Sequence, residues 1–442
     1  MTNSKRLTKK HLMLFMMLFS VPVFGQWTTT ALSEGKAQMG AVSYGTKVWF
    51  GGGGIDTGAT SQVEIYDLAT EEWSMKQLSI PRLFPAAGAV GGKVFFAGGI
   101  NFGIFEHYSR VDIFDTLSQT WTTAELSSPK FDVAAVSYGN LLFFAGGVNL
   151  ITGNDSIIDI YHADTDQWTT ATLSQSGAVR AAVSGSKLIF VGAFGSSLMD
   201  IYEAATSTWT TKTLPYARLF PAVTAVGDKI IIAGGVNFDN SLTDRVDVYD
   251  LITGEWTVAK LSMPRAFINN AAVACGKAFF AGGGNFEIAT ISWFPIPASN
   301  QVDIFDPVTN QWTTDQLNNT AVVQSVLGNG NHVLVTGGAD STGLVSSVQI
   351  YTCNLSDVFE GDSNSDSNTP FFINPATDFL YFSDEFAVGA PGTITLTSVT
   401  GQVVCFEKLA VSQLNISHLR PGIYFLHLKI GERIQSGKLV KQ

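Results

Sequence analysis

Charged residues are scarce in this chain of 442 residues: Lys, Arg, Asp and Glu together make up 14% of it. Disordered chains carry many charges and few aromatic residues, whereas aromatic residues make up 12% of this chain. Coiled coils are rich in Glu, Lys and Arg. The composition therefore excludes both classes, and the length allows one large repeat domain or two to three ordinary ones.

Basic residues are the scarcer kind of charge. Lys and Arg number 26 against 37 Asp and Glu, which gives a formal net charge of −11. Nucleic acids and anionic membrane surfaces both select proteins with a positive surface. We therefore predict neither nucleic acid nor an anionic membrane as a partner.

Cysteine and the usual catalytic motifs are also lacking. The three cysteines, Cys275, Cys353 and Cys405, are odd in number and widely spaced, so they predict buried free thiols rather than a disulfide framework or a zinc site. His-x-His, His-Glu-x-x-His and Gly-x-Ser-x-Gly do not occur. The sequence thus predicts no metal, no cofactor and no catalytic residue, and it leans away from an enzyme.

Long apolar runs are absent after the N-terminal region. That region has four basic residues, then an apolar run of eight, Leu12 to Phe19, which is too short to span a bilayer. Val23 and Gly25 are small enough for cleavage before Gln26. We predict a signal peptide at 1–25, with a membrane anchor as the alternative, and no transmembrane segment in the mature chain.

One pattern, Trp-Thr/Ser-x-x-x-Leu, recurs through most of the chain. It begins at Trp27, Trp73, Trp121, Trp168, Trp209, Trp256 and Trp312. All but the first follow an aromatic residue by seven positions, and one further aromatic, Tyr351, has no Trp after it; the paired aromatics are Tyr66, Phe114, Tyr161, Tyr202, Tyr249 and Phe305. Upstream of each aromatic an apolar run ends in a glycine doublet, except at Gly192-Ala193; the doublets are Gly52-Gly53, Gly98-Gly99, Gly146-Gly147, Gly234-Gly235, Gly282-Gly283 and Gly337-Gly338.

Each unit reads as four short antiparallel strands, A to D, joined by tight turns. In the second unit we expect strands at 86–90, 93–97, 111–115 and 121–126. Seven such units make a propeller. Because Trp27 is a strand D without A to C before it, and Tyr351 ends a strand C without D after it, we expect the N-terminal strand to complete the seventh blade and close the ring.

Doublet glycine, then an aromatic, then Trp seven residues later resembles the kelch repeat, in register seven times over residues 26–353. The resemblance implies an all-β, seven-bladed propeller. It also implies that the doublet glycines allow close backbone contact and that the aromatic residues fill the space between blades. We therefore interpret the glycines and aromatics of the repeat as structural.

The remaining chain divides at its polar, acidic stretch. We predict a linker at 354–370 and a small β-sandwich at 371–442, with strands near 379–382, 393–397, 401–404 and 422–428. The motifs Asn374-Pro375-Ala376-Thr377, Leu419-Arg420-Pro421-Gly422-Ile423-Tyr424 and Gly437-Lys438-Leu439-Val440-Lys441 resemble the C-terminal sorting domain of the type IX secretion system of Bacteroidetes. That resemblance implies contact with the secretion machinery, passage through the outer membrane, and a secreted or cell-surface location.

The loops that join strand D to A and strand B to C carry the candidate site, because both kinds lie at one end of a blade. A basic residue precedes the first doublet glycine by 16 or 17 positions in five units: Lys36, Arg82, Lys130, Arg218 and Arg265. Phe84 and Phe220 follow two residues after such a cation. Asparagine stands two residues after four doublets: Asn101, Asn149, Asn237 and Asn285.

These residues predict a mouth ringed by cations, amides and aromatic rings that could hold an acidic peptide or sugar. The alternative is that the cations and asparagines tie the loops together. Strand C also carries a recurrent acid, which we expect on a solvated face or in a turn contact: Glu64, Asp112, Asp159, Asp200, Asp247 and Asp303. The long B–C loop of the sixth unit adds Trp293 as a contact residue.

The sequence therefore favours an exported binding module for a protein or glycan. Two alternatives stay open: a sugar-modifying enzyme of the sialic-acid type, using Arg82, Arg218 and a carboxylate such as Glu106 or Asp239, and a purely architectural adhesion protein.

Overall fold

The computed structural model describes residues 26–268, 271–284, 298–322 and 324–353, and beyond these the C-terminal strands between 371 and 441 without most of the segments that join them. The predicted signal peptide (1–25) and linker (354–370) lie outside the described residues. The described part of the chain contains no helix that is long and apolar enough to cross a membrane.

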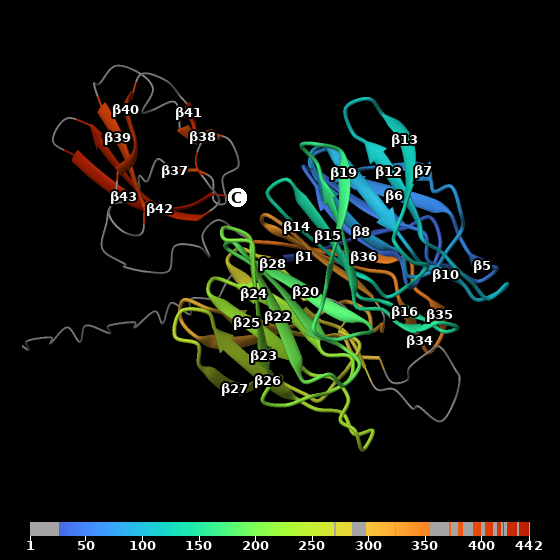
Figure 1. Cartoon of the computed structure of the whole chain (residues 1–442). Helices are drawn as coiled ribbons and strands as arrows, with labels where there is room; N and C mark the ends of the chain where they lie inside the picture. Colours follow the sequence, from blue (N-terminus) through green and yellow to red (C-terminus); the bar gives the residue numbers. More distant parts are fainter. Residues whose placement is uncertain are drawn as a thin grey trace, which may run out of the picture.

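Residues 26–353 form seven four-stranded antiparallel sheets, the blades, arranged around one axis (Figure 1). Strand A of each blade contacts strand A of the next, and the seventh contacts the first, so these strands form the innermost ring. They are β2 (Gly40–Tyr44), β8 (Ala86–Val90), β14 (Ala134–Tyr138), β20 (Val179–Ser184), β24 (Ala222–Val226), β28 (Ala272–Ala274) and β32 (Ser325–Asn329).

Strands B and C follow outward in each blade. Strands B are β3 (Lys47–Gly51), β9 (Lys93–Ala97), β15 (Leu141–Ala145), β21 (Lys187–Gly192), β25 (Lys229–Ala233), β29 (Lys277–Ala281) and β33 (His332–Thr336). Strands C are β6 (Gln62–Asp67), β12 (Arg110–Asp115), β18 (Ile157–His162), β22 (Leu198–Glu203), β26 (Arg245–Asp250), β30 (Gln301–Asp306) and β36 (Ser347–Thr352).

The outer strands D are β7 (Glu72–Gln77), β13 (Thr120–Glu125), β19 (Gln167–Thr172), β23 (Thr208–Thr213), β27 (Trp256–Lys260), β31 (Gln311–Gln316) and, for the seventh blade, β1 (Gln26–Ala31). β1 pairs antiparallel with β36, with Trp27 opposite Tyr351. The predicted closure by the N-terminal strand is therefore confirmed, as are the seven blades and the strand positions of the second one.

The core lies between neighbouring blades. Strands B are buried from their second residue onward, because apolar side chains on both of their faces meet adjacent sheets. Phe95 of the second blade, for example, has its ring centroid 4.8 Å from that of Tyr161 in the third. Within each blade the repeated aromatic of strand C lies directly opposite the repeated Trp of strand D, with ring centroids 4.8 to 5.3 Å apart. These side chains fill the space between the sheets.

The glycine doublets lie where strand B ends and the chain turns. Gly98 has a φ of +65° and Gly99 a φ of +110°. A Cβ atom on Gly98 would lie 2.5 Å from the carbonyl oxygen of Lys130 in the next blade. Only glycine meets both requirements, the left-handed backbone and the close contact.

The C-terminal region forms two further sheets. One contains β37 (Phe371–Phe372), β38 (Phe379–Phe382) and β41 (Gln413–Asn415); the other is ordered β40 (Val403–Leu409), β39 (Gly392–Ser398), β42 (Gly422–Ile430) and β43 (Arg433–Lys441). Ile394, Leu396, Leu426 and Leu439 are buried in the second sheet. The predicted strands are present, and the packing of the two sheets into a sandwich stays a prediction.

Candidate functional site

The propeller has two faces of different construction. We call the first the loop face; it comprises the D–A connections 32–39, 78–85, 126–133, 173–178, 214–221, 261–271 and 317–324, and the B–C connections 52–61, 98–109, 146–156, 193–197, 234–244, 282–300 and 337–346. We call the opposite end, made of the A–B and C–D turns, the turn face. The described residues of the sequence-predicted site all belong to the loop face.

The five predicted cations do not form a solvent-facing ring, which corrects that prediction. Lys36, Arg82, Lys130 and Arg265 have no exposed surface, and Arg218 is 1% exposed. Each cation forms an ion pair with the recurrent acid on strand C of its own blade. The N–O distances are 2.5 Å for Lys36–Glu64, 2.8 Å for Arg82–Asp112, 3.1 Å for Lys130–Asp159, 2.5 Å for Arg218–Asp247 and 2.6 Å for Arg265–Asp303.

The same side chains also fix the backbone of the blade. Arg82, Arg218 and Arg265 each donate from Nη2 to a strand B carbonyl, that of Phe96, Ile232 or Phe280. Burial lowers the pKa of all three guanidinium groups and the paired carboxylates oppose this shift, so the arginines stay charged. The acids in turn accept backbone N–H groups at the start of the D–A loops, as Asp112 does from Ser79 at 2.9 Å.

The strand C acids are therefore buried, and the expectation of a solvated face was wrong, whereas the turn contact is present. The alternative of a sugar-modifying site on Arg82 and Arg218 meets the same obstacle, because both groups are enclosed within their blades. Charge-assisted bonds hold these groups inside their blades, although the Nε atoms of Arg82, Arg218 and Arg265 have no hydrogen-bond partner among the described residues. We interpret the pairs as structural.

Two blades depart from this arrangement in a consistent way. In blade seven both charges are replaced, since Gln349 stands at the acid's position and accepts the N–H of Asn318. In blade four Gln175 donates to the strand B carbonyl of Phe190 in place of an arginine, and Asp200 accepts bonds from Ser174 and Thr211 instead. Loss of the cation therefore accompanies loss or re-pairing of the acid.

The asparagines of the B–C loops serve the turns in which they lie. Asn101 accepts the N–H of Gly103 at 2.9 Å, and Asn149 accepts those of Ile151 and Thr152 while donating to the carbonyl of Pro129. Asn237 accepts the hydroxyl of Tyr216 and donates to Ser241. These bonds match the loop-tying alternative. Asn285 and Trp293 lie outside the described residues.

The predicted phenylalanines have a different character. Phe84, Phe220 and their counterpart Phe267 each stand two residues after a buried cation and adopt φ values of +53°, +52° and +55°. Side chains with a Cβ seldom adopt this left-handed conformation, which costs about 1–3 kcal/mol per residue. All three are half-buried just before strand A, so they lie at the loop-face end of the innermost ring.

The half-buried rings make contacts from blade to blade. The ring centroids of Phe84 and Phe131 are 5.7 Å apart, and those of Phe220 and Phe267 are 4.6 Å apart with the rings stacked. Phe194 of blade four lies 5.1 Å from Phe220. We call these five residues the phenylalanine collar.

Neighbouring B–C hairpins are joined to the collar. In blades two and three the hairpins are β10 (Ile100–Asn101) with β11 (Glu106–His107), and β16 (Val148–Asn149) with β17 (Gly153–Asn154). The His107 ring centroid lies 5.8 Å from that of Phe131, and His107 Nε2 accepts the N–H of Leu150 at 3.1 Å. This bond requires a neutral ring with its proton on Nδ1, and burial lowers the pKa of His107 accordingly.

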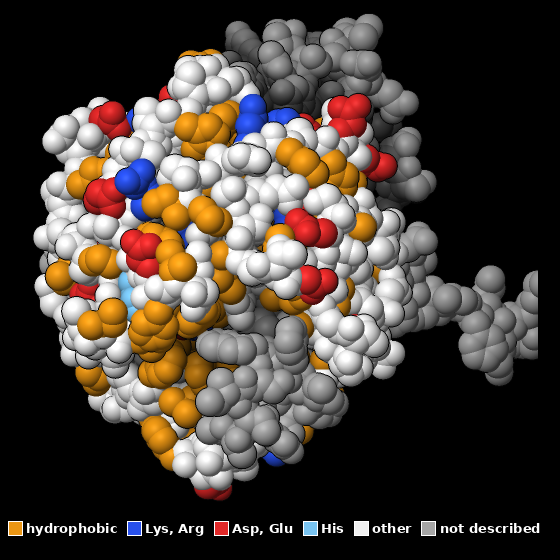
Figure 2. Space-filling model, turned by 90° about the vertical axis from the view of Figure 1, so that its right-hand side faces the viewer, with side chains coloured by type: hydrophobic (Ala, Val, Ile, Leu, Met, Phe, Trp, Pro, Cys, Tyr) orange, Lys and Arg blue, Asp and Glu red, His pale blue; other side chains and the backbone are white. Residues whose placement is uncertain are grey.

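Exposed apolar side chains lie at and around the collar, and sequence reasoning missed all of them except Phe238, which follows Asn237. They are Ile104, Phe105, Leu150, Ile151, Phe194, Tyr216, Phe238 and Met263, all on the loop face of blades two to six. Figure 2 looks toward the side of the propeller where the B–C hairpins lie and shows hydrophobic side chains gathered there. The available signal was a pair of apolar residues inside a predicted loop, Ile104-Phe105 and Leu150-Ile151.

The turn face carries the exposed lysines. Strand B begins with a lysine in five blades: Lys47, Lys93, Lys187, Lys229 and Lys277. Each pairs with an acid near the C–D turn, for example Lys187 with Glu203 at 2.7 Å. Hydrogen bonding by Lys229, aided by two turn N–H groups, lowers the pKa of Asp250 to about 2.

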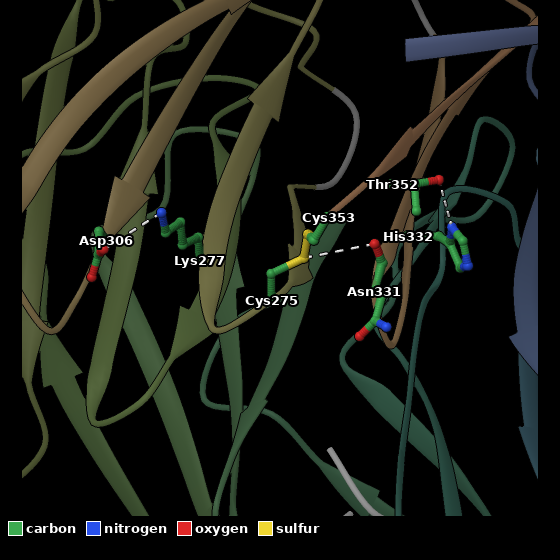
Figure 3. The surroundings of a disulfide bond; sticks show 7 residues. All are labelled: Cys275, Lys277, Asp306, Asn331, His332, Thr352 and Cys353. Carbon is green, nitrogen blue, oxygen red and sulfur yellow. Dashed lines mark hydrogen bonds and ion pairs between the residues drawn. A yellow bond between two sulfur atoms is a disulfide. The ribbon is translucent and has the colours of Figure 1, made fainter. Parts of the chain in front are cut away.

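The turn face also contains a disulfide, which corrects the expectation of free thiols (Figure 3). Cys275 in the A–B turn of blade six is bonded to Cys353, which follows β36, and their Cα atoms are 6.4 Å apart. Sequence spacing misled because 78 residues separate the two in the chain while adjacent blades bring them together. Cys353 also donates its N–H to the carbonyl of Asn331 in the next A–B turn.

Comparison with known proteins matches two parts of the chain. A model described as "Kelch motif" matches residues 217–260, and one described as "Secretion system C-terminal sorting domain" matches residues 371–442. Kelch-like protein 25 of Xenopus tropicalis is 30% identical over 108 residues, 23% of this chain and 18% of that protein. Kelch-like protein terF of Aspergillus terreus is 33% identical over 103 residues, 22% of this chain and 21% of that protein. The matches thus span about a fifth of these relatives.

Among solved structures, a fungal alcohol oxidase of the AA5 family, in complex with copper, is similar with a TM-score of 0.60 and 14% identity. The alignment covers 94% of this chain and 100% of the oxidase. At that identity the likeness shows the fold alone. In the part of the chain that the structure describes, no group of three or more His, Cys, Asp or Glu could hold a metal ion.

Proposed function

We propose that this secreted seven-bladed kelch propeller, which carries a type IX sorting domain at its C-terminus, is a binding module that holds a protein partner on its loop face. The kelch repeats and the sorting domain are the premise. Fold alone does not name a function, so the proposal depends on what this face presents.

The observation that carries the proposal is the strained collar. Three phenylalanines occupy the left-handed conformation at equivalent positions of three blades, although glycine or a small polar residue would relieve the strain. Strain of this kind persists where the side chain serves a purpose beyond folding. Aromatic residues, phenylalanine among them, are enriched in protein interfaces relative to the rest of the surface.

The distribution of exposed apolar residues supports the same face. Phe105, Phe194 and Phe238 are the exposed phenylalanines of the described residues, and all belong to the loop face. Contiguous apolar surface on a soluble protein commonly marks an interaction site. The five cations on which the sequence based an acidic ligand are buried in ion pairs, so they do not support such a ligand.

Position-dependent crosslinking tests the proposal. A photoreactive phenylalanine analogue would replace Phe105 or Phe238 on the loop face, and Leu117 or Val308 in the C–D turns as matched exposed controls. The full chain would be exported by cells of its own source and irradiated at the cell surface. We expect a discrete crosslinked protein from the loop-face positions only. Equal crosslinking from both faces, or crosslinking from the turn face alone, would overturn the proposal.

A further inference from the structure

The loop face carries unpaired negative charges as well as exposed apolar side chains. Five of its acids have no basic group within ion-pair distance among the described residues: Glu34, Asp56, Glu106, Asp239 and Asp340. Two of these acids accept hydrogen bonds that favour the ionised carboxylate. Asp239 accepts two bonds from Ser241, and Asp340 accepts two from Thr342, which lowers the pKa of both carboxyl groups.

The basic residues of the same face are all committed elsewhere. The five buried cations are enclosed in their blades. Arg180 pairs with Asp132 at 3.0 Å, and Arg245 pairs with Asp247 at 2.7 Å while its guanidinium lies 5.1 Å from the ring of Tyr216. The described loop-face connections therefore present carboxylates and apolar side chains but no exposed Lys or Arg, whereas Lys212 and Lys260 are exposed near the adjoining ends of β23 and β27.

The apolar and acidic residues alternate along the same hairpins. Ile104 and Phe105 precede Glu106 at the hairpin of blade two, and Phe238 precedes Asp239 in the B–C loop of blade five. All of these are exposed, Ile104 and Phe238 by 65% and 68%. Hydrophobic anchoring and charge are thus offered to a ligand at one place.

Blade four interrupts the row of hairpins between these two positions. Its B–C connection is only residues 193–197, between β21 and β22, and contains exposed Phe194. Phe238 from blade five lies against this short connection, because a Cβ on Gly195 would come within 2.8 Å of its ring. A ligand can therefore approach the collar residues Phe194 and Phe220 from the side of blade four, because the short connection there forms no hairpin.

We infer that the partner is a cationic segment of a protein chain with apolar anchor side chains, which lies over blades two to five with its anchors on the phenylalanine collar. This inference rests on the proposed function and names its ligand chemistry. Electrostatic complementarity favours Lys or Arg opposite Glu106 and Asp239, the carboxylates of this group that belong to blades two to five, and the aromatic rings can hold both apolar and cationic side chains. An acidic segment would meet repulsion without any compensating cation.

The test uses four pools of synthetic 12-residue peptides and the mature full chain. Three pools alternate Leu or Phe with Lys/Arg, with Asp/Glu or with Ser/Asn, and the fourth alternates Lys/Arg with Ser. Binding is followed by fluorescence anisotropy at two salt concentrations. We expect the cationic apolar pool to bind most tightly, with affinity that falls at high salt.

Two loop-face variants sharpen the test. The Glu106→Gln/Asp239→Asn variant should weaken binding of the cationic apolar pool roughly three- to ten-fold and flatten its salt dependence, since each exposed pair contributes a few-fold. The Phe105→Ser/Phe238→Ser variant should weaken binding at both salt concentrations. The Leu117→Ser/Val308→Ser variant on the turn face is the control and should bind like the parent.

The outcomes separate the two proposals. Preference for the acidic apolar pool, lost in the Phe105→Ser/Phe238→Ser variant, would overturn the cationic ligand and leave the loop face as the binding face. Equal binding of the cationic Ser pool would overturn the apolar anchors. Binding lost only in the turn-face control would overturn the proposed function as well. Absence of binding by every pool would overturn the inference, and the crosslinking pattern would still decide the face.

Discussion

The two faces of the propeller use the same left-handed backbone conformation but fill it with different side chains. In the C–D turns of the turn face it is adopted by Glu71, Gln119, Asp166, Ser207 and Asn310, with φ between +55° and +59°. These are polar residues, and Asp, Asn and Ser are common in turns because they bond to nearby backbone groups. On the loop face the equivalent strain falls on Phe84, Phe220 and Phe267 in three blades, and on the polar residues Gln38 and Asp132 at the same position of two others. The C–D turns therefore place only polar side chains in this conformation, whereas the loop face places an aromatic ring there in three of five blades.

The two faces also differ in where their ion pairs lie. On the turn face lysines and acids pair at the surface, partly in water, as with Lys187 at 37% exposure and Glu203 at 22%. On the loop face the five repeated pairs are buried, and several exposed carboxylates, among them Glu106 and Asp239, have no basic partner among the described residues. Surface pairs contribute little to stability, whereas a buried charge deprived of its partner is costly. The predictions below use this contrast.

The largest effect is expected from breaking an internal pair. Arg82→Met leaves the carboxylate of Asp112 buried without its cation and should lower the free energy of unfolding by about 3–5 kcal/mol. Lys187→Met, the same kind of change on the turn face, should cost about 0–1 kcal/mol. Urea unfolding followed by tryptophan fluorescence measures both. Equal losses for the two variants would contradict the structural role given to the internal pairs.

Loss of the disulfide should come next. The Cys275→Ser/Cys353→Ser variant opens a loop of 78 residues and should lower the free energy of unfolding by about 2–4 kcal/mol. Cys405→Ser is the control, because Cys405 belongs to β40 of the C-terminal region. Thermal unfolding of the propeller would be compared with and without reductant. A parent protein that is insensitive to reductant would show that the two thiols are not joined in solution.

The left-handed positions offer a matched pair on opposite faces. Ser207→Gly relieves strain in a C–D turn and should change stability by no more than about 1 kcal/mol, with no effect on partner binding. Phe220→Gly relieves the same strain but removes a stacked collar ring, so it should reduce partner binding at least ten-fold. Calorimetric unfolding and the anisotropy assay measure the two effects. If Phe220→Gly binds like Ser207→Gly, the collar is not the contact surface.

The smallest expected effect is the loss of stability at low pH that depends on His107. Burial lowers the pKa of His107 below its ordinary 6.5, so the unfolded chain takes up this proton at a higher pH than the folded one. Neutral His107 therefore stabilises the folded protein above pH 6.5, and this stabilisation is lost as the pH falls. Protonation also removes the acceptor for the N–H of Leu150. The melting temperature of the parent should fall more steeply than that of His107→Gln between pH 7.5 and 5.5. Equal slopes of melting temperature against pH in the two proteins would refute the assignment to His107. Burial also lowers the pKa of His332, so the His332→Gln variant is measured separately.

The repeat could be predicted from sequence because it is written seven times. Phe114 and Trp121 have counterparts at a fixed distance from one another, and Gly98 has counterparts upstream of them. Each residue type has one physical reason to stand there: a positive φ for the glycine, a filled space or a cross-strand ring contact for the aromatics. The strand limits of the second blade followed directly. The closure by Trp27 and Tyr351 also followed, since the missing strands complement one another.

The candidate site was harder to predict because of the same repetition. A cation repeated in five blades looked like a ring, but repetition is also what a structural pair produces, and the sequence does not say whether Arg218 points outward or toward Asp247. The informative residues were those that repeat poorly. Ile104, Leu150 and Phe194 lie in loops of different length, so no alignment of the units brought them together. Their common feature, exposure on one face, exists only in three dimensions.

The disulfide bears on how this protein withstands tension. Gln26 pairs with Thr352, so the first described residue of the propeller and Cys353, the last, both lie at the turn face. A pull on the chain beyond Cys353 would otherwise peel β36 from β1 one hydrogen bond at a time. With Cys353 bonded to Cys275, part of the pull passes into blade six, and the pairing of β36 with β1 is protected against force applied from this end. The bond thus braces the ring at the point where the C-terminal region leaves it.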